Sequence, residues 1–323
     1  MSDQKKLDPP KDLGGYRLVE HVADGRLGQV YRGQRTVCLG EFAKPFAVKR
    51  FRRLFTQSPS FARQLIEAIA SASALSDRTI AQSFDLFVES ERYYLASEFV
   101  DGCDLAVVCE TARNLKTPFP ALQAAFILAE GCRGLAHAIA RNPPLVHGHL
   151  TPWNIRLSRT GEVKLTDFGL SSPMYALPPG MYSPTPEDLR YVAPEVARGR
   201  RPDAGSDLYA LAVMVYELLA AAHPFDFAPG TSPGTLAASG VPRPIGEVAS
   251  IPGELEALHN RLLEADPDKR LRSAAEAYRE TCGFLDRHGL PRADPVLAQV
   301  AEELHGQVAM EEAEAEDSGS VKS

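Results

Sequence analysis

The sequence predicts an α+β fold, rich in strands in its first part and mainly helical in its second. Over residues 14–100, short runs of alternating apolar and polar residues, such as FDLFVES and RYYLASEF, are separated by polar turns, which is typical of antiparallel strands. Beyond residue 100, apolar residues recur at helical spacing, most clearly from Leu122 to Ile139. We therefore expect a β-rich lobe over residues 14–100 and a helical lobe over residues 101–288.

The composition is that of a globular protein and excludes several classes of function. The 323 residues are 44% hydrophobic and 24% charged, with a formal net charge of −7. This acidic balance argues against general nucleic-acid binding. No apolar run approaches the roughly 20 residues of a membrane helix, and residues 1–12 lack the apolar core of a secretory signal. The five cysteines are scattered without zinc-site spacing, so we expect reduced thiols in a cytoplasmic protein.

Both ends of the chain are expected to lie outside the folded unit. Residues 1–13 are polar and contain prolines, which is typical of a flexible lead-in. Residues 289–308 are predicted to form a C-terminal helical extension. Residues 309–323 are strongly acidic and are predicted to be a disordered tail.

The stretch from Pro143 to Leu170 contains the most informative residues of the chain. It predicts a loop, a short strand, a turn at Arg159–Gly161 and a second strand that leads into Asp-Phe-Gly. Asn154 and Asp167 are thereby placed at the two ends of one hairpin. Amide and carboxylate oxygens are ligands that Mg²⁺ prefers, so the pattern predicts a metal site at these two residues.

This stretch resembles the catalytic and metal-binding core of eukaryotic-like (Hanks-type) Ser/Thr protein kinases, whose pattern is H-R-D-L-K-x-x-N followed by D-F-G. Residues 147–154 read HGHLTPWN, and the D-F-G motif is intact. Gly148 stands where the family has Arg, His149 where it has the catalytic Asp, and Thr151 where it has Lys. The motif keeps its spacing and its His, Leu and Asn positions, but three of its chemically active residues are replaced.

Three segments of the first lobe resemble the nucleotide-binding parts of a kinase. The ADGRLGQV segment is similar to the Gly-rich loop that covers phosphates, AVK to the strand whose Lys pairs the phosphates, and SEFV to the hinge that meets adenine. Taken alone, the first two would equally fit a hairpin turn with two glycines and a solvent-facing lysine. Their order and spacing favour a nucleotide site. The residues assigned to it are Ala23, Gly25, Gly28, Val30, Ala47, Lys49, Ser97, Glu98, Val100 and Arg156.

One residue of this set, Arg156, departs from the family's apolar floor under adenine. It lies between two apolar residues on a strand, so its side chain is expected to point toward the cleft. Three outcomes stay open: Arg156 fills the pocket, stacks on the adenine as a cation–π partner, or extends to solvent.

Further along the chain, the resemblance assigns structural roles to several charged residues. Registering the helix at Phe61–Leu75 on the family pattern puts Ala68 where active kinases have the Glu that holds the strand Lys. Glu67 is one residue away, and so about 100° round the helix. The resemblance pairs Glu195, of the A-P-E motif, with Arg270. It also expects Asp207 to hold the backbone of the catalytic loop, although a carboxylate at a helix N-terminus has its own stabilising effect.

The replaced residues predict impaired chemistry. His149 has a different reach from the family's Asp, although imidazole can act as a base. Thr151 lacks the positive charge that the family places near the transferred phosphoryl group. Asp188 stands where the family has a Thr that contacts the catalytic loop. We hypothesise that Asp188 and His149 form an ion pair that blocks the substrate site, the alternative being that both face water.

The resemblance therefore implies a bilobal protein-kinase-like fold over roughly residues 16–287, with ATP and Mg²⁺ as its ligands. The altered residues leave open whether these ligands still bind. We predict a pseudokinase, a regulatory or scaffolding protein with weak or absent phosphotransfer. The alternatives are a low-activity Ser/Thr kinase that transfers the ATP γ-phosphate and a non-catalytic ATP-sensing switch. The expected partner is another protein, such as an active kinase or another signalling component, and neither nucleic acid nor a membrane.

Overall fold

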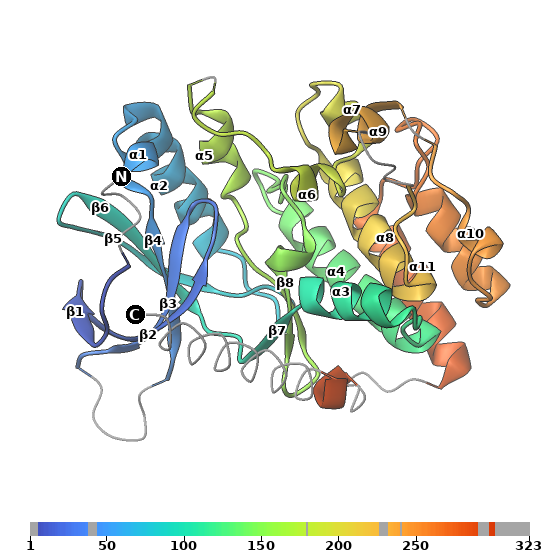
Figure 1. Cartoon of the computed structure of the whole chain (residues 1–323), viewed down its shortest axis with the longest axis horizontal. Coiled ribbons are helices and arrows are strands. Elements are labelled where there is room, and N and C mark those ends of the chain that lie inside the picture. The colour runs from blue at the N-terminus through green and yellow to red at the C-terminus, as the bar shows by residue number, and fades with distance from the viewer. Residues whose placement is uncertain are drawn as a thin grey trace, which may run out of the picture.

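The structure is a computed structural model that describes residues 6–37, 44–178, 180–225, 232–239, 241–289 and 297–300. It has a β-rich lobe and a mainly helical lobe side by side, which confirms the α+β, bilobal prediction (Figure 1). The expectations for the first five residues, for Cys38, for most of the 289–308 extension and for the 309–323 tail concern residues outside the described part. Residues 297–300 of the extension are helical, and Leu297 is buried.

The N-lobe is a six-stranded sheet in the order β1-β2-β3-β4-β6-β5, in which all neighbouring strands are antiparallel. Tyr31, Val48 and Ala96 are completely buried on it. The strands are β1 (Lys11–Leu13), β2 (Tyr16–Asp24), β3 (Gly28–Arg35), β4 (Phe46–Phe51), β5 (Ser83–Glu89) and β6 (Arg92–Glu98).

Strand β1 corrects the prediction of a flexible lead-in over residues 1–13. It pairs with β2 in the register Lys11↔Leu18 to Leu13↔Tyr16. Leu13 is 8% exposed and belongs to the apolar cluster of the sheet. Burial of this leucine and the added ladder hydrogen bonds offset the low apolar content that suggested a mobile segment.

Two helices, α1 (Arg53–Thr56) and α2 (Pro59–Ser73), complete the N-lobe. Helix α2 begins where the Ser58 side chain accepts a hydrogen bond from the amide of Phe61 and Pro59 occupies the first turn. Its apolar face, which includes Phe61 and Leu65, packs against the sheet and against Leu170 from the other lobe. The position of α2 is therefore coupled to the segment that follows the D-F-G motif.

The C-lobe is built around two long buried helices, α4 and α8. Its remaining elements are a three-stranded sheet in the order β7-β8-β9 and shorter helices. Its elements are β7 (Gly102–Asp104), α3 (Leu105–Leu115), α4 (Ala121–Ile139), η2 (Pro152–Asn154), β8 (Ile155–Ser158), β9 (Val163–Leu165), α5 (Ser171–Tyr175), α6 (Pro186–Leu189), α7 (Pro194–Ala197), α8 (Ala204–Ala220), α9 (Pro233–Ser239), η3 (Ile245–Glu247), α10 (Gly253–Leu262) and α11 (Ala274–His288).

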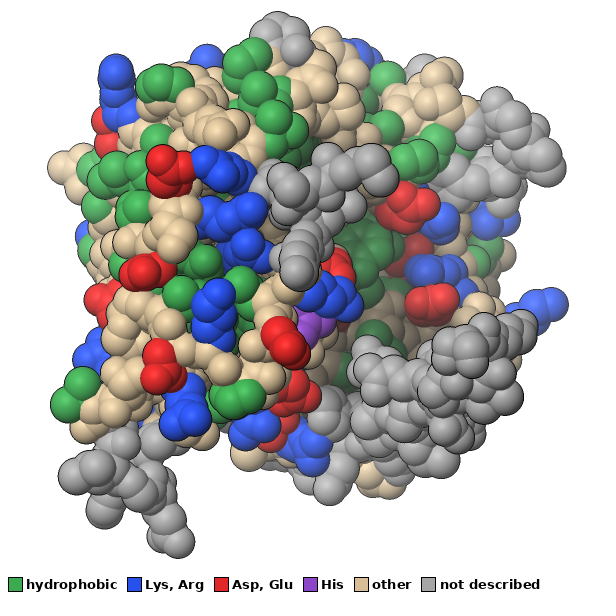
Figure 2. Space-filling view, turned by 60° about the vertical axis from the view of Figure 1, so that its left-hand side comes forward, with side chains coloured by type: hydrophobic (Ala, Val, Ile, Leu, Met, Phe, Trp, Pro, Cys, Tyr) green, Lys and Arg blue, Asp and Glu red, His purple; other side chains and the backbone are tan. Residues whose placement is uncertain are grey.

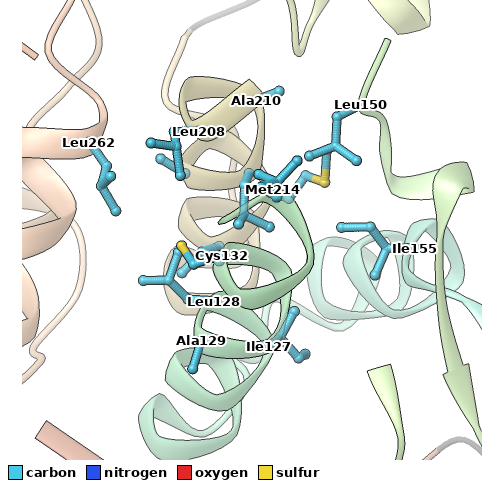
Figure 3. Close-up of a cluster of buried hydrophobic side chains, with 14 of the residues drawn as sticks. Ile127, Leu128, Ala129, Cys132, Leu150, Ile155, Leu208, Ala210, Met214 and Leu262 are labelled. Atoms are coloured by element: carbon cyan, nitrogen blue, oxygen red, sulfur yellow. The ribbon is translucent and has the colours of Figure 1, made fainter. Parts of the chain in front are cut away.

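The core of this lobe supports the segment around residues 147–154 directly. Figure 3 shows Leu150, within that segment, and Ile155, which follows it, together with side chains of α4 and α8 such as Ile127 and Met214. All four are at most 4% exposed. Close packing of this kind resists displacement, so the loop between Leu150 and Ile155 is fixed to the core at both ends.

Two further findings concern the described residues. Their cysteines, Cys103, Cys109, Cys132 and Cys282, form no disulfide bonds. Among the helices of the described residues, none is long and apolar enough to cross a membrane.

Candidate functional site

A cleft of about 420 Å³ lies between the two lobes. Every residue that the sequence assigned to the nucleotide lines it, from Ala23 in the Gly-rich loop to Arg156 on β8. Asn154, Asp167, His149 and Thr151 line it too. The fold thus brings together residues from the sheet, the hinge and the catalytic loop. Glu67, Glu195, Asp207 and Arg270 do not line this cleft.

The glycines of the Gly-rich loop have a structural reason to be present. The amide of Gly25 donates to the carbonyl oxygen of Gly28 at 2.7 Å, which closes a tight turn between β2 and β3. A Cβ on Gly28 would lie 1.8 Å from the carbonyl oxygen of Arg50 on β4. Gly28 is therefore required by the close approach of two strands.

Lys49 forms an ion pair with Asp167 and not with a residue of α2. Ala68 is 7% exposed and faces the D-F-G motif, since a Cβ on Gly169 would lie 3.0 Å from its carbonyl oxygen. Glu67 is exposed and accepts a hydrogen bond from Gln64. The Lys–Glu pair of an active kinase has no counterpart at this position of the helix.

Asn154 and Asp167 lie in contact, as a shared metal site requires. The Asn154 Nδ2 atom donates to Asp167 Oδ2 at 3.3 Å, and Thr151 Oγ1 donates to Asn154 Oδ1 at 2.8 Å. Within the described residues there is no group of three or more His, Cys, Asp or Glu side chains that could hold a metal by itself. The two oxygen-bearing side chains fit Mg²⁺ that takes its other ligands from phosphates and water, provided that Lys49 and Thr151 release them.

The catalytic loop is held by Asp207 at the start of α8. Its carboxylate accepts hydrogen bonds from the amides of His147, at 2.9 Å, and Gly148, at 2.8 Å. Burial raises the pKa of Asp207 to about 7, although these two amides act in the opposite direction. Gly148 has a φ of +72°, and a Cβ there would lie 2.6 Å from Ser171 Oγ. An arginine at this position would be strained in this conformation.

His149 lies against Tyr182, with its Nε2 atom 3.4 Å from the tyrosine hydroxyl. Burial, together with the positive charge of Arg26, lowers the pKa of His149 to about 3. The imidazole is therefore neutral near pH 7 and holds a proton poorly. A neutral ring cannot form an ion pair.

The predicted ion pair between Asp188 and His149 is wrong. Asp188 is 2% exposed and forms an ion pair with Arg26, from the Gly-rich loop. It also accepts a hydrogen bond from the amide of Thr185 at 3.0 Å, as the third residue of a capping box that begins α6. The Asp188 carboxylate thus has a cation, Arg26, and a hydrogen-bond donor, the Thr185 amide, and neither comes from His149.

Arg156 fills the floor of the cleft, which is one of the three outcomes left open. Its guanidinium donates to the carbonyl oxygens of Val100 (3.2 Å) and Gly102 (2.6 Å) and to Asp104 Oδ1 (2.7 Å). The side chain is 22% exposed. Burial raises the pKa of Asp104, although the positive charge of Arg156 lowers it. Arg156 thus binds the carbonyl oxygen of Val100 in the hinge and the carboxylate of Asp104, so these two acceptors of the cleft are already hydrogen-bonded.

The remaining predicted residues have partners of their own. Arg270 holds Glu195 through two hydrogen bonds, of 2.6 and 2.9 Å, and both side chains are buried away from the cleft. At the hinge, the Ser97 hydroxyl donates to the carbonyl oxygen of Ala47 at 3.4 Å. The Glu98 side chain turns to Lys164, at 2.8 Å.

Sequence reasoning missed three residues of the site: Arg26, Tyr182 and Asp104. Arg26 occupies a position of the Gly-rich loop at which the family pattern accepts any residue. Tyr182 lies in a proline-rich segment without periodicity. Asp104 could have been found from Arg156, because the two are cross-strand partners in the β7–β8 ladder, but that pairing was not predicted.

Comparison with known proteins gives consistent matches. The family model described as "Protein kinase domain" matches residues 16–281. The tyrosine-protein kinase MasK of Myxococcus xanthus is 28% identical over 283 residues, which cover 85% of this chain and 44% of MasK. The serine/threonine-protein kinase PrkC of Bacillus subtilis is 29% identical over 213 residues, covering 66% of this chain and 31% of PrkC. The chain thus spans less than half the length of these curated relatives.

Among solved structures, the kinase domain of Mycobacterium tuberculosis PknI is similar, with a TM-score of 0.66 at 22% identity. The match covers 86% of this chain and 99% of that domain. At this level of identity the similarity shows the fold.

Proposed function

Because the chain belongs to the protein kinase family, we propose that it is a pseudokinase, a kinase-fold protein that regulates or scaffolds another protein with weak or absent phosphotransfer. The partner would be an active kinase or another signalling component. The absence of disulfide bonds among the described cysteines supports a cytoplasmic location.

The observation that carries this proposal is the state of His149. The family uses an Asp here, whose two carboxylate oxygens can accept the hydroxyl's proton and orient the acceptor. Burial lowers the pKa of His149 to about 3, so the neutral ring offers a single nitrogen as an acceptor and carries no charge. The contact between its Nε2 atom and Tyr182 also occupies the ring nitrogen that would have to face the acceptor.

The surroundings of His149 supply no substitute. Thr151 is 4% exposed and uncharged, so no cation stands where the family's Lys steadies the phosphoryl group. The loss of one such electrostatic contact costs about 10²–10³ in rate. Two carboxylates that line the cleft with His149, Asp188 and Asp167, are paired with Arg26 and Lys49.

A second candidate function is nucleotide sensing without transfer. Lys49, Asn154 and Asp167 converge at one end of the cleft, as phosphate and Mg²⁺ binding would require. Mg²⁺ would be held by Asn154 and Asp167, and it would neutralise charge on the phosphates. Arg156 opposes this function at the other end, because it fills the floor where an adenine would lie.

A phosphotransfer assay tests the proposal. Radiolabelled ATP and Mg²⁺ are supplied with a general acceptor protein to the wild type, to Asp167→Asn and to the double variant His149→Asp/Thr151→Lys. We expect the wild type to match the Asp167→Asn background, and the double variant to gain on the order of 10² in rate if the rest of the site is competent. Wild-type transfer well above that background would refute the proposal and favour the low-activity kinase.

Thermal shift with ATP, with and without Mg²⁺, separates the two candidates. A Mg²⁺-dependent stabilisation that disappears in Lys49→Ala supports nucleotide sensing. Its absence at millimolar ATP leaves a purely protein-binding role.

A further inference from the structure

The tip of the Gly-rich loop is bound to the segment between the D-F-G and A-P-E motifs, residues 167–195, here called the activation segment. Arg26 Nη2 donates to Thr185 Oγ1 at 2.8 Å, and Arg26 Nη1 donates to the hydroxyl of Tyr182 at 3.2 Å. The same guanidinium forms the ion pair with Asp188. One side chain of the N-lobe thus holds three residues of the C-lobe.

The ionic part of this contact depends on Arg26. Asp188 is 2% exposed, and a buried carboxylate requires a compensating charge or hydrogen bonds. Thr185 supplies one amide, and Arg26 supplies the positive charge. If Arg26 were removed, Asp188 would remain as a buried charge without its cation, which favours movement of the carboxylate into water or its protonation.

Apolar packing reinforces the contact. Leu27, next to Arg26, packs against the same cluster as Leu177, Met181 and Tyr182 of the activation segment. This cluster also contains Phe61 of α2. The activation segment is therefore held between the Gly-rich loop and α2.

Hydrogen bonds on the α2 side hold the start of the segment. Ser172 Oγ donates to Gln64 Oε1 at 2.9 Å, and Ser60 Oγ donates to the carbonyl oxygen of Ala176 at 2.9 Å. These contacts position α5. Farther along the segment, Arg26 contacts Tyr182, Thr185 and Asp188, while α6 also packs against α9.

The bound segment lies in the mouth of the cleft. Arg26, Tyr182, Thr185 and Asp188 line the same cavity as Asp167. Figure 2 shows a hollow lined by hydrophobic side chains, with basic and acidic side chains and a histidine beside it. Anything that reached His149 from this side would have to displace the Arg26 contacts.

We propose that Arg26, with Asp188, Tyr182 and Thr185, forms an interlobe latch that closes the cleft by holding the activation segment across it. The latch opens when the Arg26–Asp188 pair separates. A role of this latch in controlling nucleotide access rests on the proposed function. The existence of the latch is independent of that function.

Hydrogen–deuterium exchange with mass spectrometry tests the latch without any ligand. The full chain is compared with Arg26→Ala, with Asp188→Asn, which keeps an oxygen for the Thr185 amide, and with the control Arg17→Ala. Arg17 is an exposed N-lobe arginine whose ionic contact is to Asp12 of β1. We expect amides of residues 177–189 to exchange about tenfold faster in the first two variants, as for local opening, and to be unchanged in the control.

Unchanged exchange over residues 177–189 in both Arg26→Ala and Asp188→Asn would overturn the latch. Faster exchange throughout the C-lobe, including α11, would also overturn it, because it would show general destabilisation. Faster exchange confined to residues 177–189 supports the latch. The exchange experiment tests the latch whether or not a nucleotide binds.

A second experiment tests whether the latch limits the entry of nucleotide into the cleft. It compares the thermal shift caused by ATP in the wild type and in Arg26→Ala. A larger shift in Arg26→Ala supports closure of the cleft, and equal non-zero shifts overturn that part of the proposal. If ATP shifts neither protein while the exchange result is positive, nucleotide sensing fails and the latch stands.

Discussion

The low pKa of His149 makes a prediction about stability that can be measured without knowing any substrate. The ordinary pKa of a histidine is 6.5, and in the folded protein that of His149 is lowered to about 3. The unfolded chain therefore takes up a proton at His149 below pH 6.5 that the folded chain does not accept. The contribution of this group to stability is complete above pH 6.5 and is lost as the pH falls toward 3.

The magnitude follows from linkage. One pKa unit corresponds to about 1.36 kcal/mol, so lowering the pH from 7 to 5 costs at most about 2 kcal/mol through His149. This value is an upper limit, because the ring is only half-buried. The variant His149→Gln does not titrate in this range. The difference in unfolding free energy between wild type and His149→Gln should therefore shift by up to about 2 kcal/mol between pH 7 and pH 5, in favour of the variant.

Urea unfolding at several pH values between 7 and 5 gives these differences. His259→Gln serves as a positive control far from the cleft, since burial lowers the pKa of His259 to about 4. If His259→Gln shows the shift and His149→Gln shows less than about 0.3 kcal/mol, His149 titrates normally in the folded protein. That result would remove the desolvation of His149 as support for the pseudokinase proposal, which would then rest on the replaced Asp and Lys and on the contact with Tyr182.

Three further predictions concern the frame of the site. Arg270→Met should lower the unfolding free energy by about 3–5 kcal/mol in urea titrations, because it leaves the buried Glu195 carboxylate unpaired; a loss below about 1 kcal/mol would contradict this. Gly28→Ala should lower the unfolding free energy by about 1–3 kcal/mol, since the new Cβ meets the β4 backbone. In the same urea titrations, Gly253→Ala, where nothing lies within 4 Å of the new Cβ, should be close to neutral. Arg156→Leu should tighten ATP binding about tenfold in calorimetry by giving the adenine an apolar floor, and equal or weaker binding would show that Arg156 does not obstruct the cleft.

Much of the fold was predictable because its signals are local. Strand alternation and helical spacing depend on neighbouring residues, and the order of the motifs along the chain is enough to place Lys49, Asn154 and Asp167 in one cleft. The helix register put Ala68 at the position of the family's Glu, and in the structure Ala68 lies beside Gly169 of the D-F-G motif. The assignment of Lys11–Leu13 to a lead-in was wrong because its pairing partner, β2, decides whether so short a segment is a strand.

The pairing of charges in the cleft was the least predictable part. The family pattern placed Asp188 opposite His149, and both residues line the same cavity. Nevertheless, Asp188 pairs with Arg26. A buried carboxylate is stabilised by a nearby positive charge, which Arg26 supplies. His149 supplies none, because burial lowers its pKa and keeps the ring neutral.

The sequence by itself determined the two-lobe fold, the frame of the catalytic loop and the loss of the family's catalytic Asp and Lys, because each follows from residue identities within a short window. Only the tertiary structure decided that His149 is a weak base, that Arg156 fills the floor of the cleft and that Arg26 holds the activation segment. These properties depend on desolvation and on contacts between distant residues; Arg26 and Thr185 are 159 positions apart in the chain. Such a contact exists only after both lobes have folded and brought the two side chains within reach.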